Sequence, residues 1–175
     1  LEDHGNRLAF IGCNAAGPAI ALAGEDNPGA APCEDYDWLA DQVTALKSQG
    51  YLVIVTFQAI EVDDYDPSSA QTVNFGRIAR LGPVIVSGSQ SHFPQGMAFE
   101  GDTFIHYGLG NLFFDQMDRD HRRAFIDRHI FYDGRYLGVE LATTMMEDYA
   151  QPRWMTPEER TKLLGFAFAA SDWAK

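Results

Sequence analysis

Three short apolar runs of this chain each lead into polar side chains. The runs span residues 51–57, 83–86 and 103–107. They are rich in β-branched and aromatic residues, which is typical of buried strands. Gln58 follows the first run, the polar stretch 87–92 follows the second, and Asn111 lies just beyond the third. Ligand sites of open α/β sheets lie beyond the carboxyl ends of the strands, so the pattern predicts an α/β fold with its functional groups at one sheet edge.

The first half of the sequence alternates strand and helix signals. A further buried strand is predicted over residues 7–13, and helices are predicted over 34–49 and from Ser68 onward. Ser68 and Gln71 have the spacing of a capping box. The buried stripe of that second helix is expected to consist of Val73, Ile78 and Leu81. This order of strands and helices predicts parallel strands joined by right-handed crossovers.

The second half of the sequence is typical of antiparallel hairpins. One hairpin is predicted over residues 97–107 and another over 125–144, around an Asp-Gly pair that favours a type I′ turn. Thr156 is expected to cap a C-terminal helix that ends near residue 170, with Glu159 completing a capping box. The predicted fold class is therefore α/β with a mixed sheet, in which a parallel β-α-β-α-β unit is followed by antiparallel hairpins and a C-terminal helix.

The size and charge of the chain exclude several classes of protein. Its 175 residues, of which 46% are hydrophobic, predict a single domain over residues 1–175. No apolar run approaches the roughly 20 residues that a membrane-spanning helix needs. The formal net charge of −12 argues against nucleic acid as a partner, because phosphate binding needs clustered Lys and Arg. The one basic stretch, residues 119–123, is interpreted as a solvated turn.

Cys13 and Cys33 are the only cysteines of the chain, and two interpretations of them stay open. In an exported protein they would form a disulfide across the Ala-, Gly- and Pro-rich segment 14–32, which is predicted to be a long loop. In a cytosolic domain they would be two free thiols. The chain begins at Leu1 and shows no signal peptide, so it is expected to be a processed product or a part of a longer protein.

Three sequence blocks, in matching order and spacing, resemble the CapA-type proteins of capsule and poly-γ-glutamate biosynthesis. The blocks are residues 53–61 (VIVTFQAIE), 84–92 (VIVSGSQSH) and 105–115 (IHYGLGNLFFD). They are similar to the family's strand before a His-Trp-Gly motif and a Glu, to its Gly-His-x-Pro-His loop, and to its Tyr-Ser-Leu-Gly-Asn-Phe-x-Phe-Asp block. That family belongs to the calcineurin-like metallophosphoesterase superfamily. The resemblance covers residues 7–116 and implies the C-terminal half of a four-layer α-β-β-α sandwich.

The resemblance implies a metal site, but this chain has other residues at several of the family's ligand positions. Gln58 stands where the family has the His of His-Trp-Gly, and Ser89 and Gln90 stand where it has the earlier histidines of the loop. The last histidine of that loop is kept as His92. The metal ligands of the family's first half are not found, so a missing N-terminal half or a partner chain is expected to supply them.

The chemistry of these residue types defines the candidate site. His92 can ligate a metal through a neutral ring nitrogen, and the carbonyl oxygens of Gln58 and Gln90 suit harder cations. The resemblance implies a divalent metal (Mn, Zn, Fe or Ca). Asn111 could orient a phosphate or ligate the metal through its amide oxygen, and Glu61 could act as a base or as a hydrogen-bonding partner of a ligand. Each of these residues also has a structural interpretation, as a hydrogen-bonding group of its own loop. The other histidines are interpreted as structural (His106 and His129) or exposed (His4 and His121).

The motifs leave three functional hypotheses open. In the first, the chain is a CapA-like, metal-dependent hydrolase with a depleted metal site, and it cuts a phosphoester or a bond of an anionic envelope polymer. In the second, it is a non-catalytic component that binds or assembles a cell-surface polymer. Both place the protein in the cell envelope or outside the cell. In the third, it is a stand-alone α/β domain whose likeness to the family is only structural.

Overall fold

The chain folds around a mixed sheet in the computed structural model, which describes residues 1–60 and 62–173. Within those residues the sheet has six strands in the order β1-β2-β3-β4-β6-β5. Its central strands are parallel: β2 Asn6–Asn14, β3 Leu52–Gln58, β4 Ile85–Ser89 and β6 Thr103–His106. β1 (Glu2–Asp3) and β5 (Met97–Glu100) lie antiparallel at the two edges. The predicted α/β class and its parallel β-α-β-α-β unit are confirmed.

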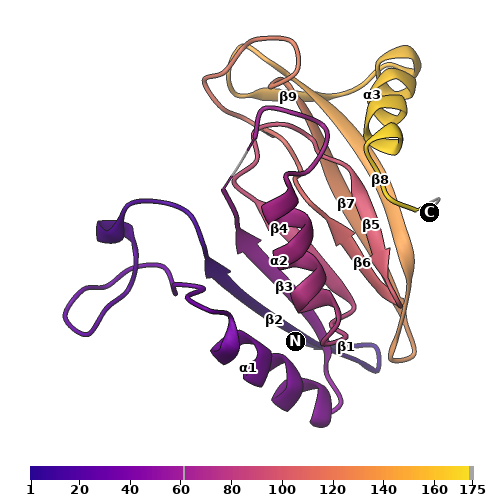
Figure 1. Cartoon of the computed structure of the whole chain (residues 1–175). Coiled ribbons are helices and arrows are strands. Elements are labelled where there is room, and N and C mark those ends of the chain that lie inside the picture. The colour runs from indigo at the N-terminus through magenta and orange to yellow at the C-terminus, as the bar shows by residue number, and fades with distance from the viewer. Residues whose placement is uncertain (61, 174–175) are drawn as a thin grey trace.

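Two helices cover one face of this sheet, namely α1 (Asp37–Ser48) and α2 (Ser69–Ala79) (Figure 1). Leu39 of α1 and Phe75 of α2 are fully buried in the core cluster between the helices and the sheet. The predicted stripe of α2 is wrong at Val73, which is exposed, because the helix turns Phe75 toward the sheet instead. No helix in the described part of the chain is long and apolar enough to span a membrane.

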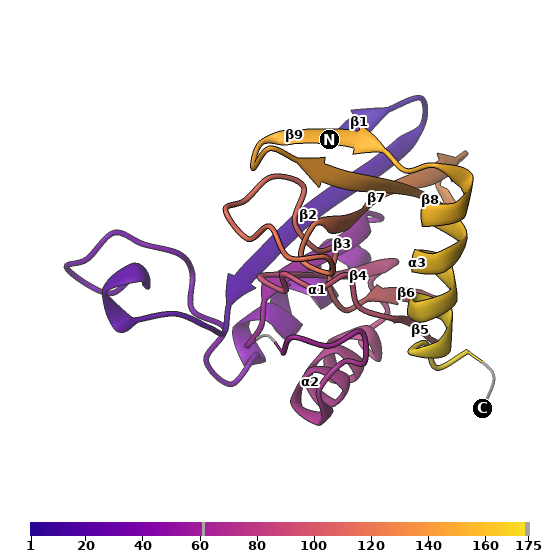
Figure 2. The same cartoon turned by 90° about the horizontal axis from the view of Figure 1, so that it is seen from above.

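A second, antiparallel sheet covers the opposite face of the first (Figure 2). Its strands are β7 Arg123–Tyr132, β8 Arg135–Glu147 and β9 Gln151–Trp154. Phe125 of β7 belongs to the same buried cluster as Ile54 and Phe104 of the first sheet. Helix α3 (Pro157–Ala169) adds Leu163 to this cluster from the side. The resulting α-β-β layers agree with the predicted part of a four-layer sandwich.

Local side-chain chemistry produces the predicted helix starts and the predicted tight turn. The hydroxyls of Ser68 and Thr156 each accept a backbone N–H inside the helix that follows, and both capping boxes are complete. Asp133 and Gly134 both have positive φ, as a type I′ turn requires. Short-range signals in the sequence were therefore sufficient to place these elements.

Two predicted boundaries differ from the structure. Helix α1 begins at Asp37 instead of residue 34, because Glu34 and Tyr36 have a left-handed φ that interrupts a helix. Strand β4 begins at Ile85 instead of residue 83 and continues to Ser89. It runs on through small polar residues because its backbone pairs with β3 up to the last residue of both strands.

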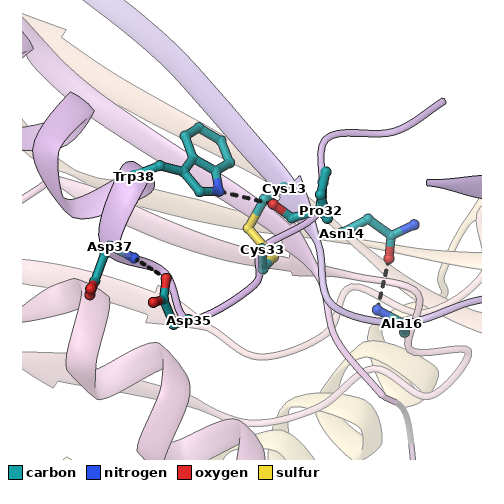
Figure 3. Close-up of a disulfide and its surroundings, with 8 residues drawn as sticks. All are labelled: Cys13, Asn14, Ala16, Pro32, Cys33, Asp35, Asp37 and Trp38. Atoms are coloured by element: carbon teal, nitrogen blue, oxygen red, sulfur yellow. Dashed lines mark hydrogen bonds between the residues drawn. A yellow bond between two sulfur atoms is a disulfide. The ribbon is translucent and has the colours of Figure 1, made fainter. Parts of the chain in front are cut away.

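The long loop between β2 and α1 is tied together near its two ends. Cys13 of β2 and Cys33 form a disulfide (Figure 3). Asn14 and Pro32 form an isolated β-bridge beside the disulfide. Of the two alternatives that the sequence left open for the cysteines, the structure contains the disulfide.

Candidate functional site

The carboxyl ends of β2, β3 and β4 lie side by side at the same end of the first sheet (Figure 1). Asn14, Gln58 and Ser89 are the last residues of these strands and are partners in the strand register. Together with Thr56 they line a groove of about 240 Å³, which we call the strand-end groove. The groove therefore presents uncharged amide and hydroxyl groups to a ligand.

Two of the predicted metal ligands, Gln58 and Gln90, contact each other beside this groove. The side-chain nitrogen Nε2 of Gln58 donates a hydrogen bond to Oε1 of Gln90. Gln90 follows β4 directly and has a φ of 86°, which is uncommon for a residue other than Gly. The structure thus brings the two glutamines together, as predicted, but their bond engages the carbonyl oxygen that Gln90 would offer to a metal.

The predicted residues His92 and Asn111 also meet. Nδ1 of His92 lies 2.6 Å from Oδ1 of Asn111. The amide nitrogen of Asn111 makes hydrogen bonds of its own, which fix the orientation of the side chain. Nδ2 of Asn111 donates to Oε1 of Gln116 and to the carbonyl oxygen of His121, both at 3.1 Å. Since Asn111 turns its acceptor toward the ring, Nδ1 of His92 is the donor, and a neutral ring then has its lone pair on Nε2. The ring centroid of Phe114 lies 4.5 Å from that of His92.

The two histidines that were interpreted as structural, His106 and His129, make their contacts elsewhere. Glu61 lies outside the described residues, so its role as a base stays a prediction. His106 is fully buried, and its Nδ1 lies 2.7 Å from Oδ2 of Asp127 in the second sheet. His129 lies 3.2 Å from the hydroxyl of Tyr136, and burial lowers the pKa of His129. These contacts fit the structural interpretation of both histidines.

His121 is not exposed, which corrects its interpretation from the sequence. Its side chain is 12% exposed and lies between two carboxylates. Nδ1 is 2.6 Å from Oδ2 of Asp118, and Nε2 is 3.3 Å from Oδ1 of Asp63. An imidazole donates hydrogen bonds from both nitrogens only when it is protonated. The backbone carbonyl of His121 accepts from Asn111, so the protonated ring helps to hold the loop that positions Asn111.

We expect an NMR titration to give His121 a pKa above 6.5. Burial lowers the pKa of His121, but its hydrogen bonds to Asp118 and Asp63 outweigh this effect and raise the value. The ion pairs therefore stabilise the fold fully below about pH 6.5, and this contribution is lost as the pH rises through the raised pKa. Asp118→Asn is expected to lower the pKa, whereas Asp115→Asn in the same loop leaves it unchanged. Equal pKa values in the wild type and Asp118→Asn would refute this account of the ring.

Sequence reasoning missed Asn14 and Thr56. The signal for Asn14 was present, because it directly follows the predicted strand 7–13 as Gln58 follows the predicted strand 51–57. Asn14 also lines a second cavity of about 440 Å³, together with Tyr36 and Asn74 among other residues. Asn14 is therefore shared by two cavities.

The described residues do not fit the metal that the resemblance implies. A two-metal hydrolytic centre needs several His and carboxylate ligands around metals about 3.5–4 Å apart. Within residues 1–60 and 62–173, no three His, Cys, Asp or Glu side chains are grouped so that they could hold a metal ion. Gln58, Gln90, His92 and Asn111 instead form two hydrogen-bonded pairs. A metal centre here would need ligands from outside this set.

Comparison with known protein families gives a match to the first two thirds of the chain. The model of a family described as "Bacterial capsule synthesis protein PGA_cap" matches residues 1–116. The match includes the first sheet, helices α1 and α2, and all of the strand ends described above. No curated protein matches the chain.

Proposed function

The chain belongs to the family of bacterial capsule synthesis proteins, and from this premise we propose that it binds a cell-surface polymer at the strand-end groove. A capsule is a polymer layer around the cell, so the family links the chain to the cell envelope. In this role the protein holds the polymer during capsule synthesis and does not cut it.

The lining of the strand-end groove is the observation that carries this proposal. Asn14, Thr56, Gln58 and Ser89 line it with amide and hydroxyl groups, which can both donate to and accept from the hydroxyl or amide groups of a polymer. Phe114, which packs on His92, is exposed. An exposed aromatic ring near polar groups suits the apolar face of a polymer unit.

The charge of the protein bears on which polymer fits. The formal net charge of −12 opposes contact with a polyanion unless a cation bridges the two. The groove itself is lined by uncharged side chains. Binding through it should therefore depend on hydrogen bonds and vary little with salt.

A second candidate function is metal-dependent hydrolysis of a phosphoester or of an anionic polymer such as poly-γ-glutamate. The pair of His92 and Asn111 favours it, because a histidine whose Nδ1 donates a hydrogen bond is oriented as metal-ligating histidines are. This candidate requires a divalent metal (Mn, Zn, Fe or Ca) and ligands beyond the described set, from Glu61 or from another chain segment. Two metal ions per protein and phosphoesterase activity that His92→Ala abolishes would favour this candidate over polymer binding.

Retention on immobilised polymers tests the binding proposal. Gln58→Ala/Ser89→Ala is expected to weaken retention of the protein at least tenfold, because each lost hydrogen bond is worth about 1 kcal/mol. The measurement is affinity chromatography on one neutral and one anionic capsule polymer, at low and high salt. Thr44→Ala/Thr161→Ala, which removes two exposed hydroxyls from α1 and α3, is the matched control and should leave retention unchanged. Wild-type protein that is retained on neither polymer would contradict the proposal.

A further inference from the structure

A basic cavity of about 360 Å³ lies between residues 119–123 and the beginning of α3. The charged side chains that line this cavity are Arg119, Arg122, Arg123, Lys162, Glu158 and Glu159. Residues 119–122 do form the predicted turn, but the stretch is not solvated throughout, because Arg122 is half-buried. Arg123 is only 4% exposed, and three arginines close in sequence form one wall of a cavity.

Hydrogen bonds fix two of these arginines in place. Nη1 of Arg123 donates to Oδ1 of Asp120 at 2.7 Å and to the hydroxyl of Tyr65 at 2.5 Å. Arg122 donates through Nε to a backbone carbonyl at 2.7 Å and pairs with Glu147 through Nη2. A guanidinium carries five N–H groups, so both arginines keep donors that these bonds do not use. Both are held in one orientation before any ligand arrives, which lowers the entropy cost of binding.

The charges around the basic cavity leave a positive excess. Within the described residues, Arg119 and Lys162 line the cavity without an ion pair. Glu159 is paired with Arg153 at 2.7 Å, and that guanidinium lowers the pKa of Glu159 to about 2. Glu158 opposes the two cations from the exposed start of α3. A concave, locally positive site is unusual on a chain whose formal net charge is −12, and it attracts anions.

We propose that the basic cavity binds an oxyanion, either a carboxylate or a phosphate group. Guanidinium groups bind both through paired, charge-assisted N–H bonds. Arg122 and Arg123 would supply oriented donors, and Arg119 and Lys162 the uncompensated charge. None of the residues that line the basic cavity lines the strand-end groove. The inference therefore goes beyond the proposed polymer binding and stands independently of it.

Titration of the full chain with two probes tests this site. The probes are inorganic phosphate and a short glutamate oligomer, and binding is measured by calorimetry and by the NMR shifts of the arginine Nε–H groups. We expect saturable binding that shifts the signals of Arg122 and Arg123. Arg119→Gln/Lys162→Gln is expected to weaken binding at least tenfold. Both substituted side chains are exposed, so this variant should keep the melting temperature of the wild type.

The control removes the same charge from another place. Arg128→Gln/Arg135→Gln lies on exposed positions of the β7–β8 hairpin and should bind within twofold of the wild type. The site is supported if a probe binds the wild type and only the cavity variant weakens that binding. The probe that binds more tightly then identifies the ligand as a carboxylate or a phosphate. Equal weakening by both variants, or no saturable binding of either probe to the wild type, would overturn the proposal.

Discussion

Replacing Cys13 and Cys33 together with alanine is expected to lower the free energy of unfolding by about 3 kcal/mol. The disulfide joins residues 20 positions apart, and without it the unfolded chain regains the conformational freedom of the closed loop. Both cysteines are buried in the core cluster under α1, so the substitution also removes some packing. Urea unfolding followed by circular dichroism measures the difference.

Reduced wild-type protein is the natural control for this experiment. It should unfold at nearly the same urea concentration as the double variant, and reductant should not affect the variant itself. The backbone bonds from Asn14 to Ala31 and from Cys33 to Asn14 beside the disulfide should then exchange their amide hydrogens faster. Because Asn14 lines the strand-end groove, polymer retention should fall as well. A double variant as stable as the oxidised wild type would show that the fold does not depend on this link.

Replacing Asp127 with alanine is expected to lower the free energy of unfolding by about 3 kcal/mol. Oδ2 of Asp127 lies 2.7 Å from Nδ1 of His106, and the two side chains are 5% and 0% exposed. The contact joins β6 of the first sheet to β7 of the second. In the described part of the chain, the remaining atoms Nε2 of His106 and Oδ1 of Asp127 have no hydrogen-bond partner. Removing the carboxylate therefore leaves the buried imidazole ring of His106 without a hydrogen-bond partner for either nitrogen.

Two further variants separate this effect from a general loss of packing. Arg128→Ala changes the next residue of β7, whose side chain is 66% exposed, and should alter stability by less than about 0.5 kcal/mol. His106→Leu/Asp127→Leu replaces the whole pair with apolar side chains and should be more stable than Asp127→Ala. Chemical denaturation of the three variants gives the comparison. If Asp127→Ala were as stable as Arg128→Ala, the pair would not be a structural link between the sheets.

The parts of the fold that the sequence predicted are those set by neighbouring residues. The capping residues Ser68 and Thr156 and the Asp133-Gly134 turn act within a few positions, so their patterns are visible in the sequence. The extension of β4 to Ser89 was not predictable from Gly and Ser residues, because it depends on the ladder with β3. The short edge strands β1 and β9 were missed for a similar reason, since they are exposed and carry no apolar pattern.

The candidate site was predictable where strand topology alone brings residues together. The carboxyl ends of parallel strands lie at the same end of a sheet, and this places Gln58 beside Gln90 and His92 beside Asn111. The position of His121 was not predictable, because its partner Asp63 is 58 residues away along the chain. The basic cavity was missed because one of its walls is α3, whose packing against residues 119–123 is a tertiary contact.

The central claim is that this capsule synthesis family member binds a polymer at the ends of its parallel strands without cutting it. The most direct test incubates capsule polymer with the full chain, with and without Mn²⁺, and measures the bound fraction and the chain length by size-exclusion chromatography with light scattering. We predict that polymer elutes together with the protein at unchanged chain length. Polymer that becomes shorter only when metal is present, and stays intact with His92→Ala, would contradict the claim and establish the hydrolase.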